Sequence, residues 1–561
     1  MAGDRIEIHT EGRAMAVFVG QIAAPLHDVR SRLRSIVGGR AYTNASALLG
    51  GSFHVLSSVD GVVSMNGTAS LSRRIFYSRM RNSTVASNRA DILADLSNSD
   101  LDAESIAVRL LVPPAPDPLD TGSMWSAVHP VPADRQLSIH PDGHTAAARW
   151  WTAPPADMSI ADTTEALRVA ISEAVALRTG DEVVTADLSG GLDSTPLAYL
   201  AWNNYPNVSA VTLTGMTEDD GDTGVALTAA SMMAGLDHLM LPVDKLVNTF
   251  DGIITPPASN DEPFFGLQLG RQAQIAEQMS QRGSALHFTG HGGDEVFSVP
   301  SVYLGDLLRT NKRVGLDHAR GLRALNKWSW SDVVNLYRDT DSYQKWTNHK
   351  FDLAPERRSG RSTSRWGEAA YVPAWVTRDA LQYVRRRFEN LDKTLTPHSP
   401  SPAQHQCIES IRTAGRISRL AGNIYAQHGI SLAYPLIDDK IVDLALRVRL
   451  HERGTPWEFK PLLRSATAKI VPPELMSRST KNDMTEDVYR DLRSARESLR
   501  EMCENSVLVS MGLVDRKELL TACGIQHAAG LSLPSFVMTM NCEAWLRSQL
   551  PKSHRKLEVH L

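Results

Sequence analysis

The chain has 561 residues, of which 42% are hydrophobic and 22% charged, and its formal net charge is -4. This length predicts two or more domains with sizeable cores, and the slight acidic excess argues against a general nucleic-acid-binding protein, because no basic surplus remains to neutralise phosphates. No apolar run approaches the roughly 18 residues of a membrane-spanning helix, and the first residues are too charged for a signal peptide. We therefore expect a cytoplasmic protein with neither nucleic acid nor membrane as a partner.

The four cysteines lie late in the chain and lack the C-x-x-C spacing of a zinc site. We expect them to be reduced and mostly buried, as is usual for so few thiols in a protein of this length. They are Cys407, Cys503, Cys523 and Cys542.

The first part of the chain predicts short strands joined by turns. Residues 15–22, 51–67 and 73–87 are rich in β-branched and aromatic side chains, with hairpin-type turns between them. Two proline-rich segments, Leu110–Asp120 and Trp150–Ser159, interrupt this pattern. The second segment is the predicted domain boundary, because the character of the sequence changes after it.

After residue 160 the sequence alternates between helical and strand patterns. Thr163–Gly180 has apolar residues at helical spacing and ends on a glycine, as a capped helix does. Apolar strands separated by helices indicate a parallel sheet with helices on both faces. The predicted strands are Val183–Leu188, Val208–Thr214 and Ala285–Thr289, and the predicted helices are Pro196–Asn203, Gly224–Ala234 and Gly270–Gln281. We expect an α/β protein (α+β overall), in which N-terminal sheets precede a doubly wound parallel sheet and a mainly helical C-terminal part.

A glycine-rich loop, Ser-Gly-Gly-Leu-Asp-Ser-Thr, follows the first predicted strand of the parallel sheet. In such sheets ligands bind beyond the carboxyl ends of the strands, and Gly190 and Gly191 would let backbone N–H groups approach an anion. The positive end of the next helix points at the same place. Three hydroxyls complete the predicted phosphate cradle, those of Ser189, Ser194 and Thr195.

Asp193 distinguishes this loop from a P-loop, which carries a lysine. A carboxylate that faces phosphates repels them unless a cation intervenes, so Asp193 predicts bound Mg²⁺. A second glycine-rich turn within Leu286–Phe297 supplies Asp294, and the two aspartates would share the metal. The competing interpretation is structural, since either aspartate could simply cap the helix that follows it.

The first loop resembles the signature of the ATP pyrophosphatases, and nearly the whole chain resembles the asparagine synthetase superfamily. The resemblance includes the second loop and the segment Ile424–Leu446, which contains Pro435 and Asp438. It implies an enzyme that cleaves ATP between the α- and β-phosphates and forms an acyl-adenylate. It further implies that the nucleotide site includes Asp187, Leu188, Leu213, Thr289 and Gly290.

Two lysines, Lys460 and Lys481, match superfamily lysines that reach the phosphates. The resemblance implies that Lys481 stabilises the tetrahedral intermediate, because adenylation and acyl transfer both build negative charge that an ammonium offsets. Either lysine alone could be a surface residue. Glu262 lies in a short acidic segment that the superfamily places near the acyl-adenylate, and His291 could act as a base or be structural.

Residues 1–155 resemble the glutaminase-type domain of the superfamily, a sandwich of β-sheets, and residues 160–561 resemble the ATP-pyrophosphatase domain. Glutamine-using members depend on a cysteine at position 2, whose thiolate attacks the glutamine amide. This sequence has Ala2, and its first cysteine is Cys407. We therefore expect the front domain to be a degenerate remnant that releases no ammonia.

An enzyme of this kind needs another amine, and two superfamily branches take it from the substrate itself. Enzymes of one branch close β-lactam rings and carry a tyrosine where this chain has His291. The other branch comprises the lasso peptide cyclases, which adenylate an Asp or Glu side chain of a precursor peptide freed of its leader and join it to the peptide's N-terminal amine. We expect this second activity, with ATP and Mg²⁺ as cofactors.

The same prediction implies a leader-binding protein and a leader peptidase as further partners, and Tyr343–Trp366 could be either a peptide-holding surface or a packed loop. The alternatives are a β-lactam synthetase-like or ammonia-using amide ligase, and a catalytically inactive scaffold. Retention of Asp193, Asp294 and Lys481 argues against the scaffold, which would need none of them.

Overall fold

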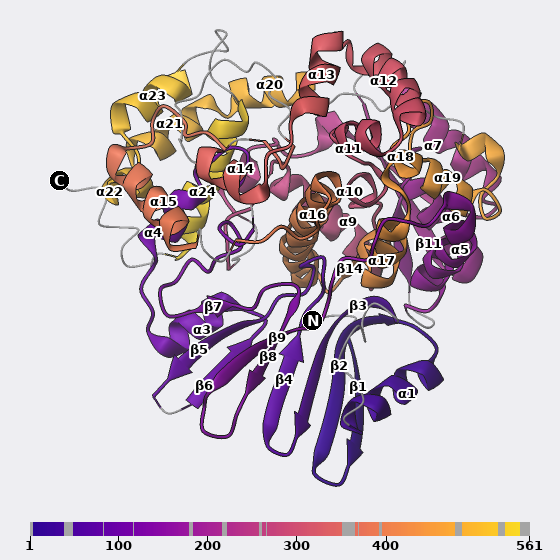
Figure 1. Ribbon diagram of the computed structural model, residues 1–561, viewed down its shortest axis with the longest axis horizontal. Coiled ribbons are helices and arrows are strands. Elements are labelled where there is room, and N and C mark those ends of the chain that lie inside the picture. The colour runs from indigo at the N-terminus through magenta and orange to yellow at the C-terminus, as the bar shows by residue number, and fades with distance from the viewer. Residues whose placement is uncertain are drawn as a thin grey trace.

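The N-terminal strands and the helix-rich remainder form two visibly different regions of the molecule. In the computed structural model the strands fan out at the bottom of Figure 1, and most helices gather above them. The structure describes residues 4–38, 49–81, 83–115, 117–178, 183–215, 221–256, 261–264, 266–350, 365–368, 370–391, 395–476, 485–524 and 533–549.

The N-terminal region contains two antiparallel sheets. The larger has the strand order β1 (Arg5–Glu11), β2 (Ala14–Ala23), β3 (Gly50–Val59), β4 (Val62–Asn66), β8 (Arg135–Ile139) and β9 (Thr145–Arg149). The smaller has the order β6 (Ser83–Ser87), β5 (Phe76–Met80) and β7 (His129–Pro130). A small apolar cluster of Met65, Ile75, Val131 and Leu137 joins the two sheets. The region also contains helices that the strand-and-turn pattern did not predict, α1 (Leu26–Val37), α3 (Ala90–Ser97) and α4 (Ala103–Val108).

The middle of the chain forms a five-stranded parallel sheet, as predicted. Its strand order is β12 (Asp237–Pro242), β11 (Val208–Thr214), β10 (Val184–Asp187), β13 (Leu286–Phe288) and β14 (Ser431–Ala433). The helices that alternate with the strands are α5 (Ile160–Ala176), α6 (Ser194–Asn204), α7 (Gly221–Met232), α8 (Asp251–Ile254) and α9 (Leu269–Gln281). Two strands were missed. β14 spans three residues, too few to show a strand period inside a segment expected to be mostly helical, and the strand pattern of β12 was overlooked.

The remaining chain is helical, as the sequence predicted. Its helices are α10 (Gly293–Phe297), α11 (Tyr303–Thr310), α12 (Lys312–Asn326), α13 (Trp330–Arg338), α14 (Tyr343–Lys350), α15 (Arg378–Leu391), α16 (Pro402–Gln427), α17 (Asp439–Arg447), α18 (Leu450–Arg453), α19 (Pro461–Thr467), α20 (Thr485–Ser494), α21 (Arg496–Glu504), α22 (Val507–Ser510), α23 (Arg516–Gly524) and α24 (Leu533–Gln549). Among the described helices, none has both the length and the apolar character needed to cross a membrane.

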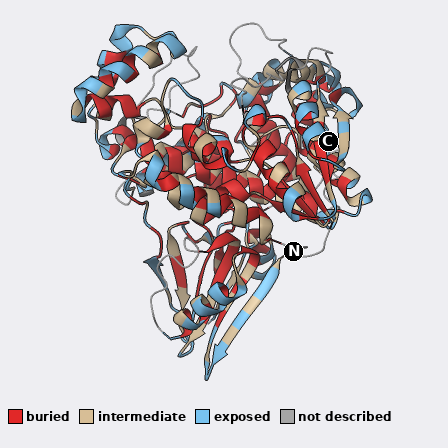
Figure 2. Ribbon diagram, turned by 90° about the vertical axis from the view of Figure 1, so that its right-hand side faces the viewer, coloured by how far each residue is buried: buried red, intermediate tan, exposed pale blue. Residues whose placement is uncertain are grey.

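Packing crosses the predicted boundary at residue 155. Residues 90–125, which include α3 and α4, share one hydrophobic core with α15, α21 and α24 from the C-terminal part. Trp150 and Trp151, in the predicted linker, are each only 3% exposed and belong to the core around the parallel sheet. Figure 2 shows buried residues running from the helical region into the upper ends of the N-terminal strands. The division of the chain into two domains therefore stays a prediction. The hydrophobic cores contain residues from both sides of the predicted boundary.

Buried polar contacts also join the two regions. Asp438 forms an ion pair of 2.6 Å with Arg178 and accepts a hydrogen bond of 3.0 Å from the backbone N–H of Gly51 in β3. Burial raises the pKa of Asp438 above its ordinary value, although Arg178 lowers it in part. Gln21 of β2 donates to the hydroxyl of Ser431 in β14 at 2.7 Å. The segment containing Pro435 and Asp438 thus fastens the parallel sheet to the N-terminal sheet.

Candidate functional site

The first glycine-rich loop connects the end of β10 to the start of α6 and is closed by its own hydroxyls. The Ser194 hydroxyl accepts a hydrogen bond of 3.1 Å from the backbone N–H of Ser189, and the two serine hydroxyls lie 2.8 Å apart. Gly190 has φ +70°, a backbone region that favours glycine. Ser189 is exposed at the tip of the loop, whereas Ser194 is buried. The loop therefore places the exposed Ser189 beside the N-terminus of a helix, a geometry suited to an anion.

The second glycine-rich loop, between β13 and α10, lies against the first. A Cβ atom added to Gly290 would be 2.6 Å from the backbone nitrogen of Ser194, and one on Gly293 would be 2.3 Å from the Asp193 carboxylate. Gly292 has φ +93° and approaches Ile437. Because real Cβ contacts are longer than this, only glycine lets the two strand ends come together.

Lys460 joins the two predicted metal ligands. Its ammonium lies 2.7 Å from the Asp193 carboxylate and 2.6 Å from that of Asp294. Asp193 occupies the N-cap position of α6, yet its side chain accepts no hydrogen bond from the helix, so capping does not explain it. Lys460 is 3% exposed and has φ +52°, an unfavourable backbone for a side chain larger than glycine. Strain of this kind at a buried lysine indicates a functional constraint.

The two carboxylates fit a magnesium site. The two carboxylates come from different loops, yet both contact the Lys460 ammonium. They therefore face one position that a positive charge occupies. Magnesium prefers carboxylate oxygens, keeps several waters and is completed by substrate phosphates. Asp193 and Asp294 would supply the protein oxygens, and the loop of Ser189 lies beside them.

Asp187, the last residue of β10, is part of a polar chain that runs into the sheet. His287 Nε2 donates to the Asp187 carboxylate at 3.1 Å, and its Nδ1 lies 2.8 Å from the Thr185 hydroxyl. Burial by itself raises the pKa of Asp187, but the charge of His287 and hydrogen bonds from His287 and Thr289 hold it below the ordinary value. The carboxylate is therefore ionised at the strand end, where a ligand binds in parallel sheets.

The role of His287 was not predicted from the sequence. Its signal was a polar pair, Thr185 and His287, inside two otherwise apolar strands, where they pair directly in the register of β10 and β13. Neighbouring positions of these strands are fully buried and apolar, for example Ala186 and Phe288.

Other predicted nucleotide residues line the strand ends in different ways. Leu188 is fully buried and its backbone N–H donates to Val211 at 2.8 Å, whereas Leu213 is partly buried against a neighbouring core. The Thr289 hydroxyl accepts from the backbone N–H of His291 at 3.3 Å. Thr195 is 0% exposed, and its buried hydroxyl has no partner among the described residues.

His291 is held by the neighbouring helix. Its Nε2 lies 3.3 Å from the backbone carbonyl of Ala414 in α16 and can donate to it, and its ring makes an edge contact with Tyr434. A histidine ring that donates a hydrogen bond to a backbone carbonyl is held in place as a structural group. To act as a base, His291 would have to use its other ring nitrogen.

Glu262 lies in a buried arginine cluster rather than in an open site. It is 2% exposed and forms ion pairs with four arginines, which lower its pKa far below the ordinary value although burial opposes this. These are Arg74, Arg109, Arg416 and Arg419. Four cations around one carboxylate leave it no free lone pair for a substrate, so the contacts support a structural role.

Two further predictions concern the rest of the site. Lys481 lies outside the described residues. Within Tyr343–Trp366, the aromatic residues Tyr343, Trp346 and Trp366 are each at most 7% exposed and pack together in one cluster. These three residues therefore form a packed core, and none of them offers a surface to a peptide.

The parallel sheet, the two glycine-rich loops at its strand ends and the two carboxylates define an α/β nucleotide-binding protein. A comparison with protein families matches residues 166–547 to the family described as asparagine synthase. The chain belongs to this family. No curated protein matches the chain significantly.

Two solved structures have weak similarity to the chain. One is described as the allosteric regulatory enzyme of purine biosynthesis (8% identity, TM-score 0.18, covering 42% of this chain and 62% of that one). The other is glutamine phosphoribosylpyrophosphate amidotransferase from B. subtilis complexed with ADP and GMP (7% identity, TM-score 0.19, covering 51% and 64%). The chain thus covers less than two thirds of either protein.

Proposed function

We propose that the chain is an ATP-dependent amide-bond-forming ligase, namely a lasso peptide macrolactam synthetase. It would adenylate an Asp or Glu side chain of a peptide and join it to the peptide's N-terminal amine. Two observations together carry the proposal, the geometry of the charged groups and the absence of an early cysteine. Lys460, Asp193 and Asp294 converge as an ATP-activating site requires, while residues 1–406 contain no cysteine that could release ammonia from glutamine. A synthetase that activates a carboxylate without that ammonia needs another amine. The amine of the substrate itself is bound together with the carboxylate, because both belong to one molecule.

The reaction has two steps, and the residues of the chain contribute to each. In the first, a carboxylate oxygen of the substrate attacks the α-phosphorus of ATP, and pyrophosphate leaves. The loop Ser189–Ser194 would hold that pyrophosphate, Asp193 and Asp294 would hold Mg²⁺, and the bound Mg²⁺ would offset the phosphate charge. Lys460 would then turn from the aspartates toward the phosphates, because the metal replaces it as their counter-ion.

In the second step the peptide amine attacks the carbonyl carbon of the acyl-adenylate. The tetrahedral intermediate collapses with loss of AMP, and the amine nitrogen releases a proton to solvent as the amide forms. The proposal assigns stabilisation of this intermediate to Lys481. Both reacting groups belong to one molecule, so holding the folded peptide supplies much of the rate.

The position of His291 favours a peptide over the small substrate of a β-lactam synthetase. The β-lactam-forming enzymes have a tyrosine at this position, whereas here a histidine lies within hydrogen-bonding distance of the Ala414 carbonyl. A neutral attacking amine suffices for macrolactam formation, which leaves a dedicated base less important.

The test is mass spectrometry of the full chain incubated with Mg²⁺, ATP and a leaderless peptide that has a free N-terminal amine and an internal Asp or Glu. We expect AMP, pyrophosphate and a product lighter than the peptide by one water. The same peptide with an acetylated N-terminus should still support pyrophosphate exchange but give no dehydrated product. An Asp→Asn or Glu→Gln peptide should support neither. Exchange only with a small β-amino acid, or a product that requires added ammonia, would contradict the proposal.

A further inference from the structure

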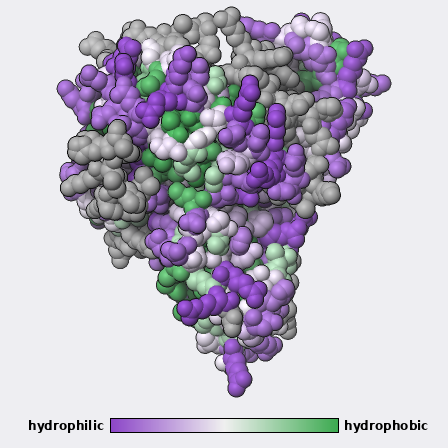
Figure 3. Space-filling view, turned by 90° about the vertical axis from the view of Figure 1, so that its left-hand side faces the viewer, coloured by the Kyte–Doolittle hydropathy of each residue, from purple (hydrophilic) through white to green (hydrophobic). Residues whose placement is uncertain are grey.

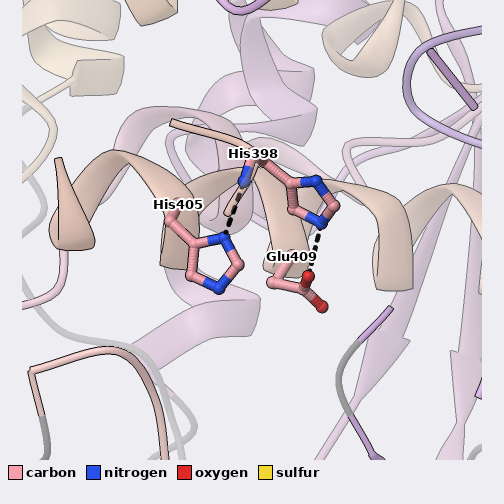
Figure 4. A group of neighbouring side chains, drawn as sticks. All are labelled: His398, His405 and Glu409. Atoms are coloured by element: carbon pink, nitrogen blue, oxygen red, sulfur yellow. Dashed lines mark hydrogen bonds and ion pairs between the residues drawn. The ribbon is translucent and has the colours of Figure 1, made fainter. Parts of the chain in front are cut away.

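Two histidines and a glutamate meet where α16 begins, away from the nucleotide loops. His405 and Glu409 lie four residues apart on α16, so they share one face of the helix. His398 reaches over from the loop before the helix, and Figure 4 shows the three side chains converging. One ligand atom from each of them lies within 4.8 Å of the others.

The ligand atoms of this group, which we call the α16 cluster (His398, His405 and Glu409), already lie close together. His398 Nε2 is 2.5 Å from Glu409 Oε1, and the lone pair of His405 Nδ1 meets only a backbone N–H, that of His398, at 3.2 Å. The carboxylate of Asp117 is 3.6 Å from His398 Nε2. His405 Nε2 is buried and has no partner among the described residues. Separations of 3–4 Å are those expected between ligands bonded to one metal at about 2.0–2.2 Å.

Arg412 does not block the cluster. Its Nη1 lies 3.1 Å from both ring nitrogens of His398, a position that only the face of the ring allows, so it leaves the in-plane lone pairs free. Arg412 is also ion-paired with Asp117, which cancels its charge.

The cluster can be reached from solvent. The side chains of His398 and Glu409 are 13% and 24% exposed. A surface pocket beside the cluster is lined by residues that include His398, Arg412 and Asp134.

We propose that the α16 cluster is a zinc site, bound through His398, His405 and Glu409 with the Asp117 carboxylate in reach as a fourth ligand. Imidazole nitrogens with carboxylates suit Zn²⁺, whereas Mg²⁺ and Ca²⁺ prefer oxygen alone. Asp117 comes from the part of the chain before residue 155 and the three other ligands from the part after it. The metal would thus tie the two segments together at the helix that also contacts His291.

The experiment uses the full chain, stripped with a chelator and titrated with Zn²⁺ alone in excess Mg²⁺, so that the oxygen site of Asp193 and Asp294 is filled. We expect one zinc per chain and a higher melting temperature. On the same wild-type protein, Co²⁺ should give the strong visible absorption of a four- or five-coordinate site. A Co²⁺ spectrum like that of the aqueous ion, or no stoichiometric zinc, would overturn the proposal.

Two variants locate the binding. Glu409→Gln should weaken zinc binding by at least about 100-fold, since changes to groups behind a metal ligand already cost 10–100-fold. His140→Ala is the matched control, because His140 and His144 form another histidine pair, with ring centres 5.8 Å apart. Equal effects of the two variants, or loss of binding in His140→Ala alone, would show that zinc binds elsewhere. If Glu409→Gln fails to fold, the Co²⁺ spectrum of the wild type decides.

Discussion

The contact between the two glycine-rich loops makes Gly290→Ala a sharp test of the site. The new Cβ would lie 2.6 Å from the backbone nitrogen of Ser194 and 2.9 Å from the carbonyl carbon of Asp193. These are backbone atoms and cannot rotate away, so reaching an ordinary contact of 3.4 Å requires the loops to separate by about 0.8 Å. Misplacement of about 1 Å costs about 100-fold in rate, equivalent to about 2.7 kcal/mol of transition-state stabilisation.

The assay is ATP–pyrophosphate exchange at saturating Mg²⁺, together with thermal melting of the same sample. We expect Gly290→Ala to lose about 100-fold in kcat/KM and about 1–3 kcal/mol of stability, as overpacking does. Gly224→Ala is the control: this glycine lies in α7, where an added Cβ meets nothing within 4 Å. It should keep full exchange and gain about 0.5–1 kcal/mol from helix propensity. Wild-type exchange by a correctly folded Gly290→Ala protein would refute the idea that loop contact positions the phosphates.

Three further predictions follow from the charged groups. Asp294→Asn should lower ATP turnover by at least about 100-fold. It should also raise the Mg²⁺ concentration needed for half-maximal rate, which a Mg²⁺ titration measures. An unchanged Mg²⁺ requirement would exclude Asp294 as a metal ligand. Glu262→Gln should cost about 3–5 kcal/mol by leaving buried arginines unpaired, whereas Glu504→Gln, in an exposed pair with Arg500, should leave the melting temperature unchanged. Burial, aided by the charge of Arg73, lowers the pKa of His54 from 6.5 to about 4. Between these two pH values the unfolded chain therefore binds more protons than the folded chain, so the stability of the fold should decrease as pH drops from 6.5 to 4. His54→Asn should reduce the slope of stability against pH by up to about 1.4 kcal/mol per pH unit. The measurement is the melting temperature as a function of pH, which should vary less in the variant.

The sequence revealed those parts of the site that are local. The strand, glycine loop and helix around Ser189–Ser194 are consecutive, so their chemistry can be read from residue types and order alone. The parallel sheet was predicted for the same reason, since apolar strands alternate with helices along the chain. The burial of Thr195 could not be predicted from residue type, because it depends on packing.

Contacts between distant segments could not be read in this way. Lys460 lies 267 residues after Asp193, and no spacing rule connects an ammonium to a carboxylate across that distance. Glu262 illustrates the reverse case: its acidic segment suggested a site, and four arginines from separate segments made it structural. His287 went unnoticed because its partner Thr185 is adjacent only through strand register.

By itself, the sequence determined the family and the parallel sheet. It also predicted two phosphate-binding loops and a carboxylate-activating ligase, and it showed an N-terminal region without cysteine. Only the tertiary structure decided which charges meet, because an ion pair or metal site depends on separations of a few ångströms that packing sets. It also decided that residues 90–125 share a core with the C-terminal helices, since apolar surface is buried against whichever partner fits it, whatever its place in the chain.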